Sequence, residues 1–193
     1  MSSANGALLQ TDFGYLVNPV TGKLYNPPQS VLNANTLGTT MAIDNAGDVF
    51  IPNPNAGGSG QIIELLAGGS TVNDGGIGQS LGLTIPPTYA PIAIDGSGHM
   101  WLMAEPNQES ELPSGLAELS KSGSALNTNS FAPGFVGPNL ESGPASIAVD
   151  GSGNVWVLTE TNNSTVTEFV GVATPVVTPL ALGVQTKSLG KKP

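Results

Sequence analysis

The chain has 193 residues, including 26 Gly and 16 Pro, and only 10% of them are charged. Typical soluble proteins carry about 25% charged residues, and helical bundles avoid this density of helix breakers, so the composition disfavours a helical bundle. The length favours one domain, and 39% hydrophobic residues are enough to build a core.

The charge balance excludes further classes. There are 14 acidic and 5 basic residues, all five of them Lys, and the net charge is −9. Because nucleic-acid binding needs clustered Lys and Arg, we expect no nucleic-acid partner. The most apolar tract, residues 169–184, contains two Pro and is too short to span a bilayer, so we expect no membrane span. The absence of Cys excludes disulfides and thiolate metal sites.

In residues 1–37 two short segments, 13–17 and 23–25, flank a turn-like Asn-Pro-Val-Thr-Gly segment. We interpret this region as an N-terminal extension or the remnant of a unit like those that follow it.

From residue 38 the chain repeats itself three times. The matching segments are MAIDNAGDVFI at 41–51, IAIDGSGHMWL at 92–102 and IAVDGSGNVWV at 147–157. A short apolar element with a central Glu follows each segment, and these residues are Glu64, Glu118 and Glu168. Two matched elements in the same order, three times, indicate a structural repeat.

Each first element predicts a β-hairpin whose turn begins at an Asp that accepts backbone N–H groups. A positive φ is expected at the turn glycines Gly47, Gly98 and Gly153. The strand after each turn is apolar at consecutive positions, which predicts burial on both faces. The aromatic residue at the centre of this strand is therefore expected to fill the space between two sheets. The three residues at this position are Phe50, Trp101 and Trp156.

A repeat of this length has room for four strands and favours a β-propeller blade. The first three strands would be the Asp-ending strand, the aromatic strand and the Glu strand. The fourth would lie within residues 70–83 in the first unit and 125–136 in the second. We therefore predict an all-β fold, with a segment of three four-stranded blades over residues 38–185 and a tail over 186–193.

The segment at 147–157 resembles the NHL-repeat signature and is similar to repeats of streptogramin-lyase-like (virginiamycin B lyase-like) propellers. Residues 168–180 resemble the ending of bacterial NHL-repeat proteins. The resemblance, over about residues 38–185, implies a partial or half propeller with NHL-like blades. Because propellers typically have four to eight blades, we expect either a homodimer or missing upstream blades to complete the ring. If the chain belongs to a longer exported protein, a secreted or periplasmic location is favoured.

In an up-and-down blade the Asp turns share one end, and the loops after the aromatic strands share the other. The second end is acidic, and we predict ligand contacts there from Glu105, Glu160, Asn162 and Asn163.

Four further groups receive structural interpretations. His99 is the only histidine, but it occupies the position of Asp48 and Asn154, so we expect an exposed turn residue. The three turn Asp residues fail the spacing of an EF-hand loop, and we expect them to stabilise turns. The three strand Glu residues are expected to serve the repeat. The lyases that the repeat resembles use His and Glu with a divalent metal on the loop-bearing face, and no matching histidine lies there. We therefore expect no catalytic residue, no metal and no cofactor.

The leading functional prediction is a non-enzymatic binding or interaction scaffold whose ligand, a protein or a small molecule, is unknown. One alternative is a metal-dependent enzyme similar to streptogramin lyases, which a second histidine in further blades would favour. Another is a structural, surface-associated repeat protein, which an exported precursor would favour.

Overall fold

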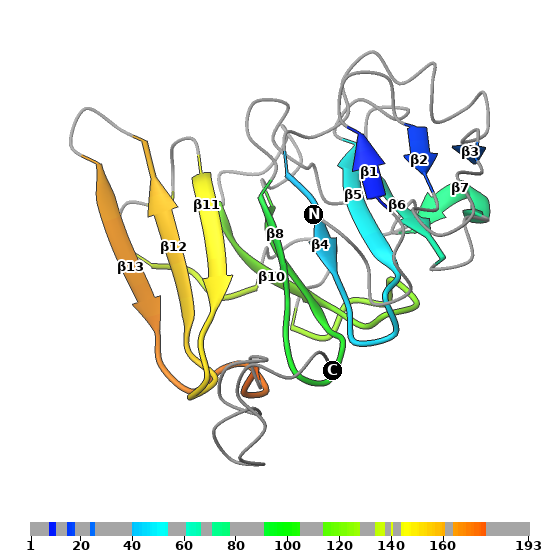
Figure 1. The fold of residues 1–193 in the computed structure, drawn as a ribbon. Helices are drawn as coiled ribbons and strands as arrows, with labels where there is room; N and C mark the ends of the chain where they lie inside the picture. The colour runs from blue at the N-terminus through cyan, green and yellow to red at the C-terminus, as the bar shows by residue number, and fades with distance from the viewer. Residues whose placement is uncertain are drawn as a thin grey trace, which may run out of the picture.

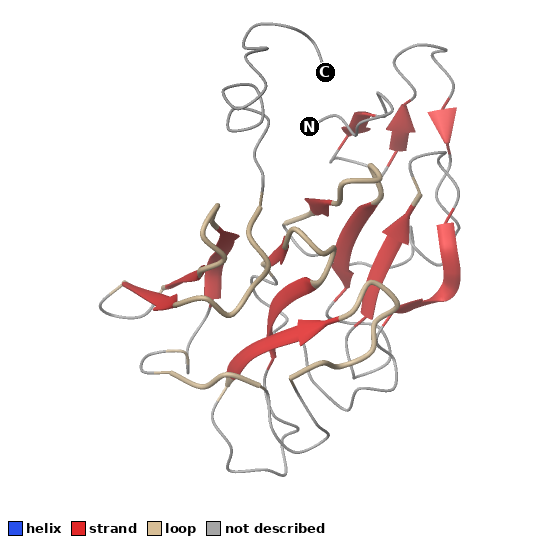
Figure 2. Cartoon of the chain, turned by 90° about the horizontal axis from the view of Figure 1, so that it is seen from below, coloured by secondary structure: helices blue, strands red, loops and turns tan. Residues whose placement is uncertain are grey.

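The regular structure of the chain is entirely β. The computed structural model (Figure 1) describes residues 8–10, 15–17, 24–25, 40–53, 61–66, 71–77, 91–104, 114–127, 134–137, 140, 144–160 and 164–176. Within these residues every regular element is a strand (Figure 2). The N-terminal strands β1 (Leu8–Gln10), β2 (Tyr15–Val17) and β3 (Leu24–Tyr25) form a three-stranded antiparallel sheet.

Three antiparallel sheets follow in chain order, and we call them the first, second and third blades. The first blade contains β4 (Ala42–Ile43), β5 (Val49–Asn53), β6 (Gln61–Leu65) and β7 (Thr71–Ile77). The second contains β8 (Ile92–Ile94), β9 (Met100–Ala104) and β10 (Gly115–Leu119). The third contains β11 (Pro144–Val149), β12 (Val155–Thr159) and β13 (Thr165–Phe169). The predicted all-β arrangement of three blades is confirmed.

The blades differ at their fourth strand. In the first blade β7 completes the sheet, as expected from residues 70–83. In the second blade the described part of the expected strand forms two isolated bridges, Leu119 with Ala125 and Leu116 with Phe135. Among the described residues no strand pairs with the outer edge of β13. Among the described residues the second and third blades each have three strands, and a full fourth strand in either of them stays a prediction.

The blades pack face to face, and each interface is an apolar layer. Strand β8 lies against both β4 and β11 (Figure 1). The layer between the first and second blades contains Phe50, Ile62, Ile92, Met100, Leu102, Ala104, Ala117 and Leu119. The layer between the second and third blades contains Trp101, Met103, Leu116, Leu140, Ile147, Val155 and Val157. Every residue of β9 is buried, as its consecutive apolar residues predicted.

The predicted domain boundaries at residues 37 and 185 stay predictions. Within the described ranges, no helix has the length and apolar character that crossing a membrane requires.

Candidate functional site

The three Asp turns have the same local structure. In each turn the Asp Oδ1 accepts hydrogen bonds from the backbone N–H groups two and four residues later, at 2.7–3.0 Å. The turn glycines have positive φ values, 86° at Gly47, 82° at Gly98 and 83° at Gly153. Both predictions for these turns are confirmed, and the second oxygen of each Asp is left for a different partner in each blade.

In the first blade the partner is a lysine from the second blade. Lys121, in the turn after β10, places Nζ 2.7 Å from Asp44 Oδ2 and 2.8 Å from Asp48 Oδ2. These hydrogen bonds raise the pKa of Lys121 above its ordinary value, so the lysine stays charged. Glu64 lies beside this group; burial raises its pKa, and the positive charge of Lys121 partly offsets that effect. Lys121, Asp44 and Asp48 therefore make an ionic contact between the first and second blades.

In the second blade the partner again comes from the following blade. Asp95 Oδ2 accepts the backbone N–H of Thr174 at 3.1 Å and the indole Nε1–H of Trp101 at 3.3 Å. Thr174 belongs to the segment after β13, and its carbonyl accepts the N–H of Gly96 at 3.1 Å. The turn of the second blade is therefore joined to the third blade by backbone hydrogen bonds.

His99 lies at the same end and is not the freely exposed turn residue that was expected. Its side chain is 34% exposed, and Nδ1 is 2.8 Å from Oε1 of Glu118 on β10. The prediction overlooked this contact because the two residues meet only when β9 and β10 pair. Possible ligand atoms of Asp95, His99 and Glu118 lie within 4.8 Å of one another, which is the spacing of a metal site. However, Asp95 already accepts four N–H groups, so hydrogen bonding accounts for the cluster.

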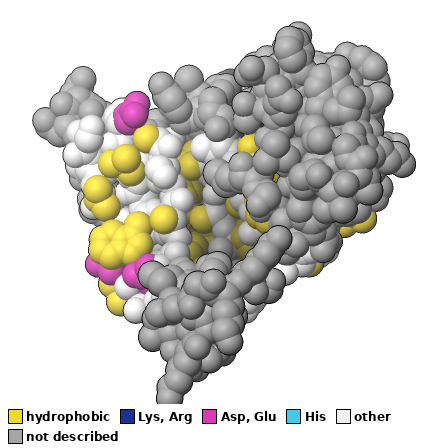
Figure 3. Space-filling view, viewed as in Figure 1, with side chains coloured by type: hydrophobic (Ala, Val, Ile, Leu, Met, Phe, Trp, Pro, Cys, Tyr) yellow, Lys and Arg dark blue, Asp and Glu magenta, His cyan; other side chains and the backbone are white. Residues whose placement is uncertain are grey.

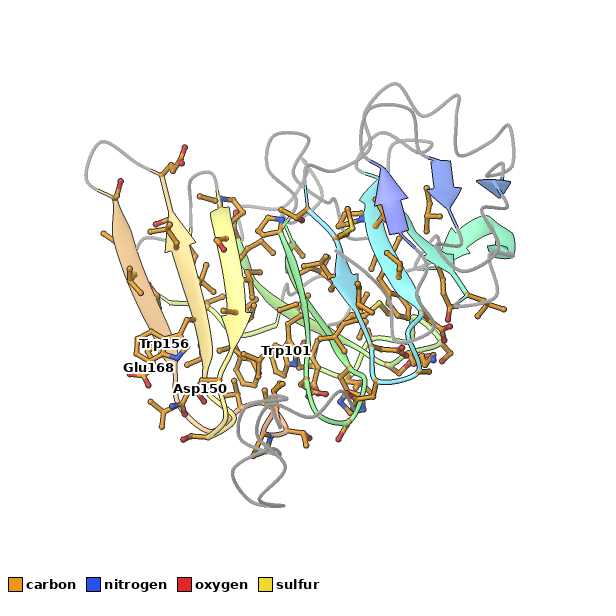
Figure 4. The ribbon with its side chains drawn as sticks, in the orientation of Figure 1. Trp101, Asp150, Trp156 and Glu168 are labelled. Carbon is orange, nitrogen blue, oxygen red and sulfur yellow. The ribbon has the colours of Figure 1, made fainter. Side chains whose placement is uncertain are left out.

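In the third blade the donors to the second oxygen of Asp150 come from the blade itself. Its Oδ2 accepts Trp156 Nε1–H and Asn154 Nδ2–H, both at 3.0 Å. Together with the backbone N–H bonds these contacts, the one from Trp156 foremost, lower the pKa of Asp150 to about 2. The turn thus presents a stable negative charge beside an indole ring (Figure 4).

The face of the third blade that carries Trp156 is exposed. Trp101 is 0% exposed, whereas Trp156, at the matching position, is 37% exposed. Its neighbours on this face are Leu158 and Val166, 37% and 63% exposed, and the carboxylate of Glu168, whose residue pairs with Trp156 across the strands. We call these four residues the Trp156 face. In Figure 3, apolar side chains gather where Figure 4 labels Trp156, with acidic side chains beside them.

The prediction that Trp156 is buried between blades is therefore wrong. The prediction that β12 is buried on both faces is wrong as well. Strand β12 alternates between buried and exposed residues. The physical reason is that β12 packs against the second blade on one side, whereas no described blade covers its other side.

The predicted ligand residues are only partly described. Glu160 is exposed at the end of β12, whereas Glu105, Asn162 and Asn163 lie outside the described residues. Lys121 was missed by the sequence analysis. The sequence signal for a cation was Asp48, which stands where the other repeats have His99 and Asn154. It places a second carboxylate near that of Asp44, and a nearby cation relieves the repulsion between two like charges.

Comparison with known proteins supports the fold alone. No protein-family model matches the chain, and no curated protein matches it. Among solved structures, the chain is similar to a luciferin-regenerating enzyme, with 15% identity, a TM-score of 0.53, and coverage of 91% of this chain and 64% of that one. It is also similar to a protein of unknown function from Bacteroides caccae, with 13% identity, a TM-score of 0.47, and coverage of 92% and 55%. The chain therefore spans less than two thirds of either protein.

Proposed function

We propose that this chain is a binding scaffold built from NHL-like propeller blades, and that it engages a protein partner through the Trp156 face. One observation carries the proposal: the same face of the second blade is buried by the third blade, while Trp156 remains 37% exposed. Contiguous exposed apolar residues with a polar border commonly mark interaction sites. Tryptophan is also among the residues that contribute most to protein interfaces.

The experiment that tests this proposal uses photo-crosslinking in the source cells. A crosslinking amino acid is placed at Leu158, and matched controls carry it at Ser97, on the opposite end from the loops, or at Glu160, at the loop-bearing end. The protein that crosslinks through position 158 is identified and purified. Its affinity for the wild-type chain and for Trp156→Ala is then measured by calorimetry.

We expect the substitution to weaken binding by about 10-fold or more, which is typical of a central aromatic residue. Equal affinities would contradict the proposal. Crosslinks confined to position 160 would instead support the predicted ligand contacts of Glu105, Glu160, Asn162 and Asn163.

A further inference from the structure

In the second blade, the outer edge of β10 is covered by a short segment that contains Phe135. Leu116 on β10 donates its N–H to the carbonyl of Phe135 at 2.7 Å, and Phe135 donates back to Leu116 at 3.0 Å. The Phe135 ring stacks on Trp101, with ring centroids 6.2 Å apart and an interplanar angle of 16°. A single extended residue therefore pairs with the strand edge and stacks on the tryptophan.

The third blade presents the matching groups. Val166 on β13 is opposite Leu158 on β12, which is the same register position as Leu116 opposite Met103 in the second blade. Its N–H and C=O therefore point away from β12, since successive residues of a strand alternate in bonding direction. Among the described residues no backbone hydrogen bond joins Val166 to a segment outside the blade. β13 forms the outer edge of the molecule in Figure 1.

The charge around this edge selects the partner. Glu168 lies beside Trp156, and the low pKa of Asp150 keeps that carboxylate ionised. A cation bound beside these acids would also lie near the Trp156 indole, whose ring attracts cations. The complementary ligand is therefore basic.

A second copy of the chain does not fit this surface. Two Trp156 faces in contact would bring their acidic groups together, and each chain carries a net charge of −9. The face of the first blade that would continue the stack in a head-to-tail copy is already buried, since Val49, Ile51 and Ile63 are only 4–7% exposed. Charge and burial therefore both favour a different protein over a second copy as the occupant.

We propose that the β13 edge and the Trp156 face bind an extended, basic segment of another protein with an aromatic residue in the place that Phe135 takes on the second blade. This inference rests on the proposed function and specifies its partner. The segment would add an antiparallel strand, a known mode of peptide recognition. Its aromatic residue would pair with Val166 and stack on Trp156, and a Lys or Arg two residues away would lie opposite Glu168.

The test uses the peptide Ac-Lys-Val-Phe-Val-Lys-NH2, in which Phe and both Lys share one face of a strand. Binding is followed in the chain with Trp101→Phe, where Trp156 is the remaining fluorophore of its kind; phenylalanine already occupies this position in the first blade, as Phe50. If that variant does not fold, the backbone amide of Val166 and the indole N–H of Trp156 are followed by NMR in the wild-type chain.

We expect saturable binding that shifts both NMR signals. Replacing the peptide Phe by Ala should weaken binding by about 2- to 10-fold. N-methylation of the Phe amide, which blocks pairing with Val166, should weaken it by a similar factor. Replacing both peptide Lys by Glu should abolish binding. Trp156→Ala should lose binding, whereas the matched variant Glu118→Gln on the second blade should retain it.

Equal affinities for the four peptides, or a bound peptide that leaves the Val166 amide unshifted, would overturn the inference. Dimers in sedimentation equilibrium that Trp156→Ala dissociates would overturn it too, because the occupant would then be a second copy. A protein partner that depends on Trp156 while every peptide fails would reject the extended segment and leave the proposed function standing. A partner affinity insensitive to Trp156→Ala would reject the proposed function itself.

Discussion

The second and third blades have the same hairpin, the same Asp turn and the same hydrogen bond from a tryptophan indole to the turn Asp. They nevertheless differ in burial: β9 is buried along its whole length, whereas β12 alternates between buried and exposed residues. The difference shows that burial of a blade strand depends on its neighbours and not on the strand's own residues. It also locates the surface available for binding.

The Asp turns also differ in which part of the chain supplies the donors to their second oxygen. Lys121 joins the first blade to the second, and Thr174 joins the second to the third, in each case through Oδ2 of the turn Asp. In the third blade Asn154 and Trp156 supply the donors locally. The second oxygen of Asp150 is therefore satisfied by residues of its own hairpin.

The largest expected effect is the difference in stability loss between alanine substitutions of the two tryptophans. Trp101→Ala removes a fully buried indole and should lower the free energy of unfolding by about 3–5 kcal/mol. Trp156→Ala removes a partly exposed one and should cost about 1 kcal/mol, close to the range of surface substitutions. Urea denaturation of both variants measures the difference. Equal losses would mean that the third blade is covered in solution.

The second comparison concerns two turn glycines with nearly equal φ. An alanine Cβ at Gly98 would meet no atom within 4 Å, so Gly98→Ala should cost about 1–2 kcal/mol from backbone strain alone. At Gly153 the Cβ would also overlap the carbonyl oxygen of Ala173, which should add about 1–3 kcal/mol. Thermal denaturation of the two variants tests this order. The reverse order would show that the segment after β13 does not pack on the third turn.

The third comparison concerns the ionic contact between the first two blades. Lys121→Met leaves Asp44 and Asp48 without their cation and should cost about 1–2 kcal/mol, a reduced value because Lys121 is 45% exposed. Adding Asp48→Asn, which copies Asn154 of the third repeat, should recover part of the loss. Strict additivity in a double-mutant cycle would contradict direct coupling.

The pH dependence of this contact has a definite sign. The lysine pKa is raised in the folded state, so the stabilisation is fully present below the ordinary value of 10.5. It is lost as the pH rises through the raised pKa. The stability difference between wild type and Lys121→Met should therefore be constant at neutral pH and shrink under strongly alkaline conditions.

The smallest expected effect is confined to the third turn. Trp156→Phe removes the hydrogen bond that contributes most to lowering the Asp150 pKa, and this pKa should rise from about 2 toward the ordinary 3.8. Because a lowered carboxylate pKa stabilises the fold above 3.8 and loses this effect as the pH falls toward 2, the variant should lose less stability on acidification. Carbon-detected NMR titration of Asp150 measures the shift. An unchanged pKa would show that the exposed indole does not hold the bond in solution.

Several features could be predicted from the sequence because they depend on residues close together in the chain. The Asp turn is made by hydrogen bonds spanning two and four residues, and the positive φ of Gly98 and Gly153 follows from the position of each glycine in that turn. The pairing of aromatic and Glu strands follows from a repeat in which neighbouring strands are also neighbours in sequence. These local determinants were enough to establish an all-β fold of three successive blades.

The tertiary structure alone decided which repeated residues are buried, paired or exposed. Lys121 bonds to an Asp that lies 77 residues away, and Thr174 to one 79 residues away, and no local pattern specifies such partners. His99 meets Glu118 only because β9 and β10 pair. Trp101 and Trp156 have matching sequence surroundings, yet one is covered by the next blade and the other is open. Similar repeats acquire different environments because each blade interface depends on what packs beside it.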